Sequence, residues 1–270
     1  MAENNFSLQK TLTMLLDEKK YHSLRDILST MNPADIAAIF DDLDQACLPL
    51  LFRLLPKELA AETFVEMEPE AQELLIRGFS DSELKEVIDE LYVDDAVDIV
   101  EEMPANVVQR ILSQAEPDMR KQINEILRYP EDSAGSIMTT EYVSLRPNMT
   151  VEEAILRIRR TGIDKETIYT CYVTRGHKLI GLTSVKDLLL CEDDDATIES
   201  IMQEHVITVG TLDDKEQVAQ MFSKYNFLAL PVVDTEDRLV GIVTFDDAMD
   251  VMEDEATEDM EKMAAMLPSE

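Results

Sequence analysis

Apolar residues in the first half of the chain recur at intervals of three and four, which is the spacing of one face of an α-helix. Units of similar pattern, separated by 23, 24 and 24 residues, begin at Pro33, Pro56, Ser80 and Pro104. Pro and Ser are both favoured at helix N-termini. Further helix starts lie within the units, at Glu68, Asp94 and Glu116. The pattern therefore predicts an α-solenoid with two short helices per unit, from about residue 6 to residue 128.

The pattern changes at residues 129–135, and the second half is also repeated, with a longer period. The matching segments are Ile137-Met138 with Ile201-Met202, and residues 179–182 with residues 239–242. Each copy reads as helix, strand, turn, strand and helix. The first helices of the copies are expected at residues 151–160 and 215–225. The sequence thus predicts a β-α-β-β-α unit present twice, with the copies packed by pseudo-twofold symmetry.

Residues 245–267 have the pattern of one amphipathic helix about 34 Å long. Its apolar stripe consists of Met249, Met252, Ala256, Met260, Met263 and Leu267. Acidic residues follow the same rhythm two positions earlier, which places them on the opposite side of the helix. Residues 246–270 contain ten acids and a single base, Lys262. Pro268 is expected to end this helix.

These patterns predict the fold class: an α + α/β multidomain chain with an α-solenoid, a doubled α/β module and a long C-terminal amphipathic helix. The expected domains are an acidic helical-repeat domain, the two α/β copies and the acidic helix. Their boundaries are residues 1–128, 129–198, 199–248 and 249–270.

Charge narrows the range of functions. The 270 residues contain 57 Asp and Glu against 24 Lys and Arg, a formal net charge of −33. A phosphate backbone or an anionic membrane surface would be repelled, whereas cations and basic partners would be attracted. Three widely separated cysteines fit a reducing compartment. The sequence does not open with a basic segment followed by an apolar stretch, so we expect a protein that is not secreted. No run approaches the roughly 18 apolar residues that a membrane span needs.

Signatures of catalysis are missing from the sequence. It contains no phosphate-binding loop, dinucleotide fingerprint, zinc-protease motif or nucleophile elbow. Its three histidines lie in different units and have no cysteine neighbours at zinc spacing. We therefore expect a protein that is not an enzyme.

A paired motif ends the two α/β copies: Ser184 followed by Asp187, and Thr244 followed by Asp247. A hydroxyl three residues before an acid, directly after a buried strand, is typical of a helix N-cap. The same groups can hold a nucleotide, because Asp accepts hydrogen bonds from ribose and helix amides face phosphate. From the motif alone, capping and nucleotide binding both remain open.

This doubled ending resembles tandem CBS domains. The chain also contains the segment Tyr129-Pro-Glu-Asp-Ser-Ala-Gly135-Ser-Ile-Met138-Thr139. The MgtE family of bacterial magnesium channels has a similar segment at the start of its CBS module. Residues 227–234 and 241–259 also resemble that family, and the helical repeats resemble its acidic N domain. In this family a five-helix transmembrane pore follows the acidic helix, which is called the plug helix. The chain is therefore expected to be the cytosolic part of such a channel.

The resemblance implies site residues. The expected Mg²⁺ ligands are Glu62, Asp94, Asp98, Asp214, Asp247, Asp250, Glu255, Glu258 and Asp259. The expected ATP contacts are Lys186, Asp187, Phe227, Leu228 and Pro231. Two positions depart from the family: Asn226 stands where Asp is frequent, and Thr170 stands where an aromatic ring would stack on adenine. A bridging metal site should therefore be weaker or differently built here, and Thr170 leaves open whether this copy binds ATP.

The expected function is Mg²⁺ sensing and gating in a magnesium channel of the bacterial inner membrane, with this region on the cytoplasmic side. It would act as a homodimer through its CBS domains, attached to its own pore and binding no nucleic acid. Mg²⁺ would neutralise facing acids, compact the dimer and close the pore. One alternative is a free-standing CBS regulator of a soluble partner, which binds adenine nucleotides. Another is an acidic scaffold without a ligand.

Overall fold

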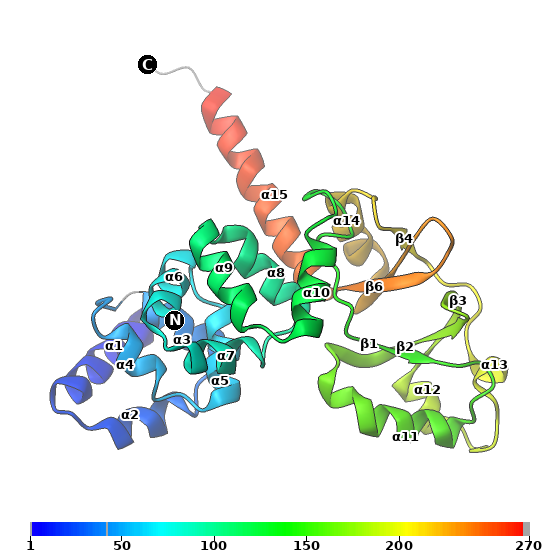
Figure 1. Ribbon diagram of the computed structural model, residues 1–270, viewed down its shortest axis with the longest axis horizontal. Coiled ribbons are helices and arrows are strands. Elements are labelled where there is room, and N and C mark those ends of the chain that lie inside the picture. Colours follow the sequence, from blue (N-terminus) through cyan, green and yellow to red (C-terminus); the bar gives the residue numbers. More distant parts are fainter. Residues whose placement is uncertain (1, 42, 267–270) are drawn as a thin grey trace. The chain divides into compact units, whose positions relative to one another are not determined.

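The protein is described by a computed structural model that covers residues 2–41 and 43–266 (Figure 1). Contacts within the chain divide it into two compact units, Met1–Leu91 with Asp95–Lys121, and Tyr92–Asp94 with Gln122–Glu270. The helices of the first half are α1 Ala2–Asp17, α2 Tyr21–Leu28, α3 Pro33–Asp41, α4 Leu48–Phe52, α5 Lys57–Val65, α6 Pro69–Gly78, α7 Asp81–Ile88, α8 Val93–Glu102, α9 Ala105–Gln114 and α10 Pro117–Ile126.

The predicted helix starts are confirmed. Pro33 is the first residue of α3, and the N-caps of α5, α7 and α9 are Pro56, Ser80 and Pro104. Ser80 forms a complete capping box, in which its side chain and that of Glu83 each accept from the other's backbone N–H. The fold begins earlier than expected, because α1 already starts at Ala2.

Apolar side chains at helical spacing form the core of the helical unit. Phe52, Phe64 and Phe79 pack together, with ring centroids 5.4–6.4 Å apart. Arg110 from α9 closes the C-terminal end of α6, where it donates to the backbone oxygens of Ile76 and Phe79. These carbonyls lie at the negative end of the helix dipole, so a guanidinium satisfies them well.

The second unit contains two three-stranded sheets in the orders β1-β2-β3 and β4-β5-β6. In each sheet the first pair of strands is parallel and the second pair antiparallel. The first copy consists of β1 Tyr142–Leu145, α11 Val151–Thr161, the 3₁₀ turn η1 Gly162–Asp164, β2 Thr167–Arg175, β3 Lys178–Ser184 and α12 Val185–Leu190. The second consists of α13 Ile198–Ile201, β4 Val209–Gly210, α14 Lys215–Tyr225, β5 Ala229–Val233, β6 Leu239–Thr244 and α15 Phe245–Met266. The predicted β-α-β-β-α order is therefore confirmed.

Reciprocal hydrogen bonds tie the two copies together. The segment before the first copy bonds to the second sheet, where Thr139 and Ile242 exchange N–H···O bonds of 2.8 and 2.9 Å. The segment before the second copy bonds to the first sheet, where Leu182 and Gln203 exchange bonds of 3.0 and 2.8 Å. Each copy thus completes the other, which is the pseudo-twofold symmetry that the repeat predicted.

The two hairpin turns repeat this exchange. Leu179 N–H donates to the carbonyl of Asp237 at 3.2 Å, and Leu239 N–H donates to the carbonyl of His177 at 3.0 Å. A small apolar cluster fills the contact between the copies; its buried members are Tyr172, Ala229, Leu239 and Ile242. The two sheets therefore form one module that shares hydrogen bonds and core.

The last described helix, α15, is the long amphipathic helix that the sequence predicts, and it packs against α14 and β6 (Figure 1). Of its methionine stripe, Met249, Met252, Met260 and Met263 are exposed by 36–66 %. Leu267 and Pro268, the expected end of the helix, lie outside the described residues. No helix within residues 2–41 and 43–266 is long and apolar enough to cross a membrane.

Candidate metal and nucleotide sites

The Ser184–Asp187 motif is a complete capping box of α12, and the Thr244–Asp247 motif forms the reciprocal half of such a box before α15. Ser184 Oγ accepts from the Asp187 N–H at 3.0 Å, and Asp187 accepts from the Ser184 hydroxyl at 2.6 Å. In the second copy, Asp247 accepts from the Thr244 N–H at 3.2 Å and from the Thr244 hydroxyl. These bonds satisfy the amide of Asp187 in the first turn of α12 and the amide of Thr244 directly before α15.

The residues expected at the nucleotide site lie on two stretches of the CBS-like module. Lys186 and Asp187 are exposed in the first turn of α12, and Thr170 pairs with Ser184 across β2 and β3. Pro231 is a buried residue of β5.

The segment that leads into β5 carries the other two nucleotide candidates. Phe227 packs edge-on against Phe222 at 6.4 Å and tilted against Tyr225 at 5.3 Å. These contacts fix the Phe227 ring, whereas the neighbouring Leu228 is 59 % exposed. Leu228 is therefore an apolar side chain that a ligand can cover.

The metal candidates of the first half lie on α5 and α8. Glu62 is exposed on α5. Asp94 is buried at the start of α8, with 5 % of its surface exposed, and Asp98 is exposed one turn further along. Asp94 lies in the first turn of α8, where the helix dipole favours a negative charge.

In the second half, Asp247 is a candidate whose pKa lies well above the usual value of an aspartate. Burial, and then repulsion from Asp246 and Asp250, raise its pKa to about 6 against the pull of the Thr244 hydrogen bonds. The charged form of Asp247 is therefore unfavourable in this environment. Protonation would remove the charge, and a nearby cation would stabilise it.

The remaining candidates are distributed along α14 and α15. Asp214 caps α14 by accepting from Gln217 N–H at 3.0 Å. Asp250 is exposed and Glu255 half-buried, while Glu258 pairs with Lys262 at 2.6 Å. The side chain of Asp259 lies outside the described residues. Within the described side chains, no group of three or more His, Cys, Asp and Glu is close enough to hold a metal ion.

Asn226, the expected departure from the family, ends α14. It has a left-handed backbone, with φ 54° and ψ 45°, and its N–H bonds the carbonyl of Phe222 at 2.8 Å. Asn is one of the few residues with a side chain that tolerate this conformation. Its position therefore has a structural reason independent of any metal.

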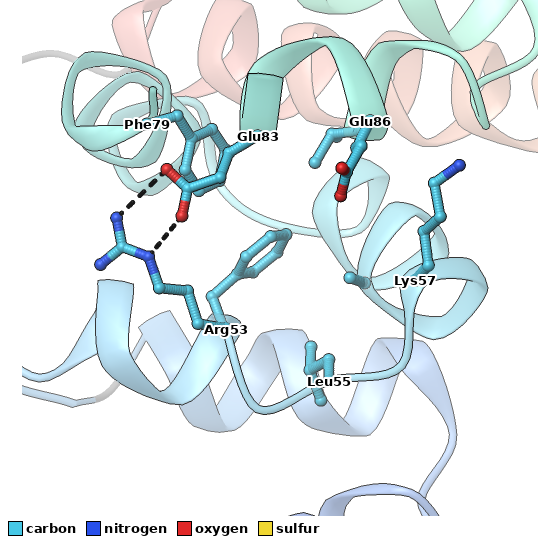
Figure 2. Close-up of a pocket in the computed structure, with 9 residues that line it drawn as sticks. Arg53, Leu55, Lys57, Phe79, Glu83 and Glu86 are labelled. Carbon is cyan, nitrogen blue, oxygen red and sulfur yellow. Dashed lines mark hydrogen bonds and ion pairs between the residues drawn. The ribbon is translucent and has the colours of Figure 1, made fainter. Parts of the chain in front are cut away.

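The helical unit contains a feature that the sequence analysis missed, a cavity of about 380 Å³ bordered by α4, α5 and α7 (Figure 2). Arg53 and Glu83 form an ion pair at its edge, with Nε and Oε1 2.6 Å apart. The only sequence signal was a pair of neighbouring bases, Arg53 and Lys57, in a strongly acidic region.

The fold and the two capping motifs define a module of paired CBS domains preceded by an acidic helical domain. Family models agree: residues 31–132 match the MgtE intracellular N domain, and residues 134–192 and 198–254 each match the CBS domain.

Solved structures that resemble this chain show its family more specifically. A crystal structure of the cytosolic domain of the Mg²⁺ channel MgtE in complex with ATP is 38 % identical, with a TM-score of 0.84, and covers 90 % of this chain and 99 % of that one. A crystal structure of the soluble part of a magnesium transporter is 33 % identical, with a TM-score of 0.83, over 95 % and 100 % of the two chains. The chain belongs to the MgtE family, a family of transporters and not of enzymes.

Curated relatives are longer than this chain. The magnesium transporter MgtE of Thermus thermophilus is 39 % identical over 96 % of this chain and 58 % of its own length. The magnesium transporter MgtE of Bacillus subtilis is 32 % identical over 94 % and 56 %. The chain thus spans somewhat more than half the length of these relatives.

Proposed function

We propose that the chain is the Mg²⁺-sensing and gating region of a magnesium channel in a bacterial inner membrane, and that it faces the cytoplasm. It would work as a homodimer through its CBS domains and transmit their state to a transmembrane pore of the same protein. The observation that carries the proposal is the excess of acidic over basic residues in the acidic helix, ten acids against one base in residues 246–270.

Electrostatics supplies the mechanism. Two carboxylates about 6 Å apart repel by roughly 3 kcal/mol at an effective dielectric constant near 20, and by less where salt screens them. A divalent cation between them turns repulsion into attraction, because Mg²⁺ binds carboxylate oxygens while keeping several waters. Acidic faces would therefore separate at low Mg²⁺ and close at high Mg²⁺.

The proposal makes gating a shift between populations. Several weakly bound ions that bind only the compact arrangement shift the population toward that arrangement. The shift grows with the number of bound ions and with the Mg²⁺ concentration. Compaction would hold the pore shut, and loss of Mg²⁺ would release it. The residues proposed to bind these ions are Glu62, Asp94, Asp98, Asp214, Asp247, Asp250, Glu255, Glu258 and Asp259.

ATP is proposed as a second ligand of the CBS module. A relative of known structure has been crystallised with ATP, and Lys186 and Asp187 lie exposed at the N-terminus of α12 in this chain. Lys186 would meet phosphate, Asp187 would accept from ribose, and Phe227, Leu228 and Pro231 would contact the base. Since Asp187 already caps α12, it would serve both purposes with its two oxygens.

The test is a Mg²⁺ titration of the chain followed by small-angle X-ray scattering and thermal melting. We expect the radius of gyration to fall and the melting temperature to rise at millimolar Mg²⁺. The triple variant Asp94→Asn, Asp98→Asn and Asp250→Asn should lose most of both responses.

A matched control removes the same charge elsewhere, through Glu58→Gln, Glu70→Gln and Glu204→Gln at exposed positions. This control should respond as the parent does. Equal contraction of the Asp variant and the parent would refute the proposed sites, and no contraction of the parent at tens of millimolar Mg²⁺ would refute sensing itself. Nucleotide binding without any response to Mg²⁺ would instead support a free-standing CBS regulator.

A further inference from the structure

The cavity of the helical unit has an apolar floor. Phe52 ends α4, Phe79 follows α6, and both rings line the cavity although each is at most 5 % exposed. Their centroids are 5.4 Å apart, and Phe64 supports both from behind. A volume of about 380 Å³ lies within the range of small-molecule sites. Water on such a surface is readily displaced by an apolar group.

Both bases that border the cavity form ion pairs. Arg53 Nε donates to Glu83 Oε1 at 2.6 Å, and Arg53 NH2 reaches Glu83 Oε2 at 3.5 Å (Figure 2). Arg53, followed by the amide and hydroxyl of Ser80, lowers the pKa of Glu83 to about 2. Lys57 Nζ donates to Glu90 at 2.6 Å. Arg53, Lys57 and Glu83 are therefore all engaged with partners.

Glu86 is the remaining charged group of the lining. It projects from α7 at the edge of the cavity, above Leu55 and beside Lys57 in Figure 2. It makes no hydrogen bond or ion pair with the residues that the structure describes; its charge acts on Lys57 only at a distance. The cavity thus combines an aromatic floor with one solvent-exposed carboxylate that forms no ion pair with the residues that the structure describes.

We propose that this cavity binds a small organic monocation, in which an aromatic or aliphatic body lies on Phe52 and Phe79 and a primary ammonium meets Glu86. The inference is independent of the proposed Mg²⁺ and ATP sites. An organic anion would be repelled by the carboxylates of Glu83 and Glu86 at the cavity. A neutral ligand would gain the apolar contact without the charge-assisted hydrogen bond.

The experiment uses the whole chain with ¹³C-labelled methyl groups and three ligands of similar shape. They are 2-phenylethylammonium, 2-phenylethanol and 3-phenylpropanoate. We expect the ammonium to cause saturable shifts of the Leu55, Ala60 and Val87 methyl signals. The alcohol should bind roughly tenfold more weakly, the size expected when a hydrogen bond to a charged group is lost.

Single substitutions distinguish the contribution of the Glu86 charge to binding from the contribution of the cavity's shape. Glu86→Gln should reduce the affinity of the ammonium to that of the alcohol, whereas Glu58→Gln, an equal loss of charge on neighbouring α5, should change nothing. Ala60→Leu should fill the cavity and abolish binding of both ligands, with folding checked in the same methyl spectra. The proposal is overturned by tighter binding of the propanoate, by an unchanged affinity in Glu86→Gln, or by no saturable shift at tens of millimolar ammonium.

Discussion

Met138 lies too close to Gly241 for a side chain at that position: a Cβ atom built on Gly241 would be 2.6 Å from Met138 Sδ and 2.8 Å from the Thr139 carbonyl oxygen. The same relationship joins Met202 to Gly181, with 2.6 Å to the sulfur and 2.9 Å to the carbonyl oxygen of Gln203. Each glycine therefore admits the crossing segment that bonds to its strand.

This relationship predicts that Gly241→Ala weakens the CBS pair. The methionine side chain can move, but the carbonyl of Thr139 is held by the hydrogen bond from Ile242, so the segment must shift. We expect a loss of about 1–3 kcal/mol in the free energy of unfolding, measured by urea denaturation. The control is Gly78→Ala, because a Cβ at Gly78 meets nothing within 4 Å. That variant should gain about 0.4–1 kcal/mol, and equal effects of the two changes would contradict the packing argument.

Removing the hydroxyl of a helix cap should lower the stability of the folded protein. Ser184→Ala deletes the oxygen that accepts from the Asp187 N–H at the start of α12. We expect a loss of about 1 kcal/mol in the free energy of unfolding. Ser223→Ala, at an exposed interior position of α14, should change stability by only a few tenths of a kcal/mol. A Ser184→Ala variant as stable as the parent would show that the cap contributes little.

Asp247 should make stability depend on pH. Because its pKa rises from 3.8 to about 6 on folding, the folded state holds this proton more tightly than the unfolded state. The resulting stabilisation is complete below about pH 4 and is lost as the pH rises through 6. Asp247→Asn should remove this dependence and, without divalent cations, raise stability at pH 7 by on the order of 2 kcal/mol.

The titration itself is visible in the ¹³C carboxyl signal of Asp247. We expect a midpoint near pH 6 without metal. Asp234, whose pKa is lowered chiefly by the hydrogen bond from the Arg238 backbone, provides an internal comparison. If Asp247 is a Mg²⁺ ligand as proposed, added Mg²⁺ should move its midpoint downward, since the ion binds only the charged form. A midpoint near 4 without metal would contradict the effect of burial.

Restoring an aromatic ring at position 170 should strengthen ATP binding. Thr170 pairs with Ser184, which caps the helix carrying Lys186 and Asp187. A ring there could stack on adenine, and such stacking contributes about 1–3 kcal/mol. We therefore expect Thr170→Tyr to lower the Kd for ATP roughly tenfold by calorimetry. Thr161→Tyr at the end of α11 should leave the Kd unchanged, and no gain in Thr170→Tyr would place adenine elsewhere.

The sequence predicts the elements of this protein well because their causes are local. Pro56, Ser80 and Pro104 cap helices, since N-cap preference acts within one turn. The Ser184 motif caps α12 for the same reason. The order of strands and helices in the CBS pair follows from apolar periodicity and from the repeat itself.

The tertiary structure decided what depends on groups that are distant along the chain. Met138 packs against Gly241 of the second sheet, and Met202 packs against Gly181 of the first. Both contacts require the two sheets to be formed, and no local pattern of the sequence encodes them. The pKa of Asp247 follows from its burial, and the apolar cavity beside Glu86 exists only where α4, α5 and α7 meet around the rings of Phe52 and Phe79. Periodicity and capping act over a few residues, and the sequence displays them directly. Burial, electrostatic coupling and cavity shape are properties of packing, and they arise only when distant segments come together.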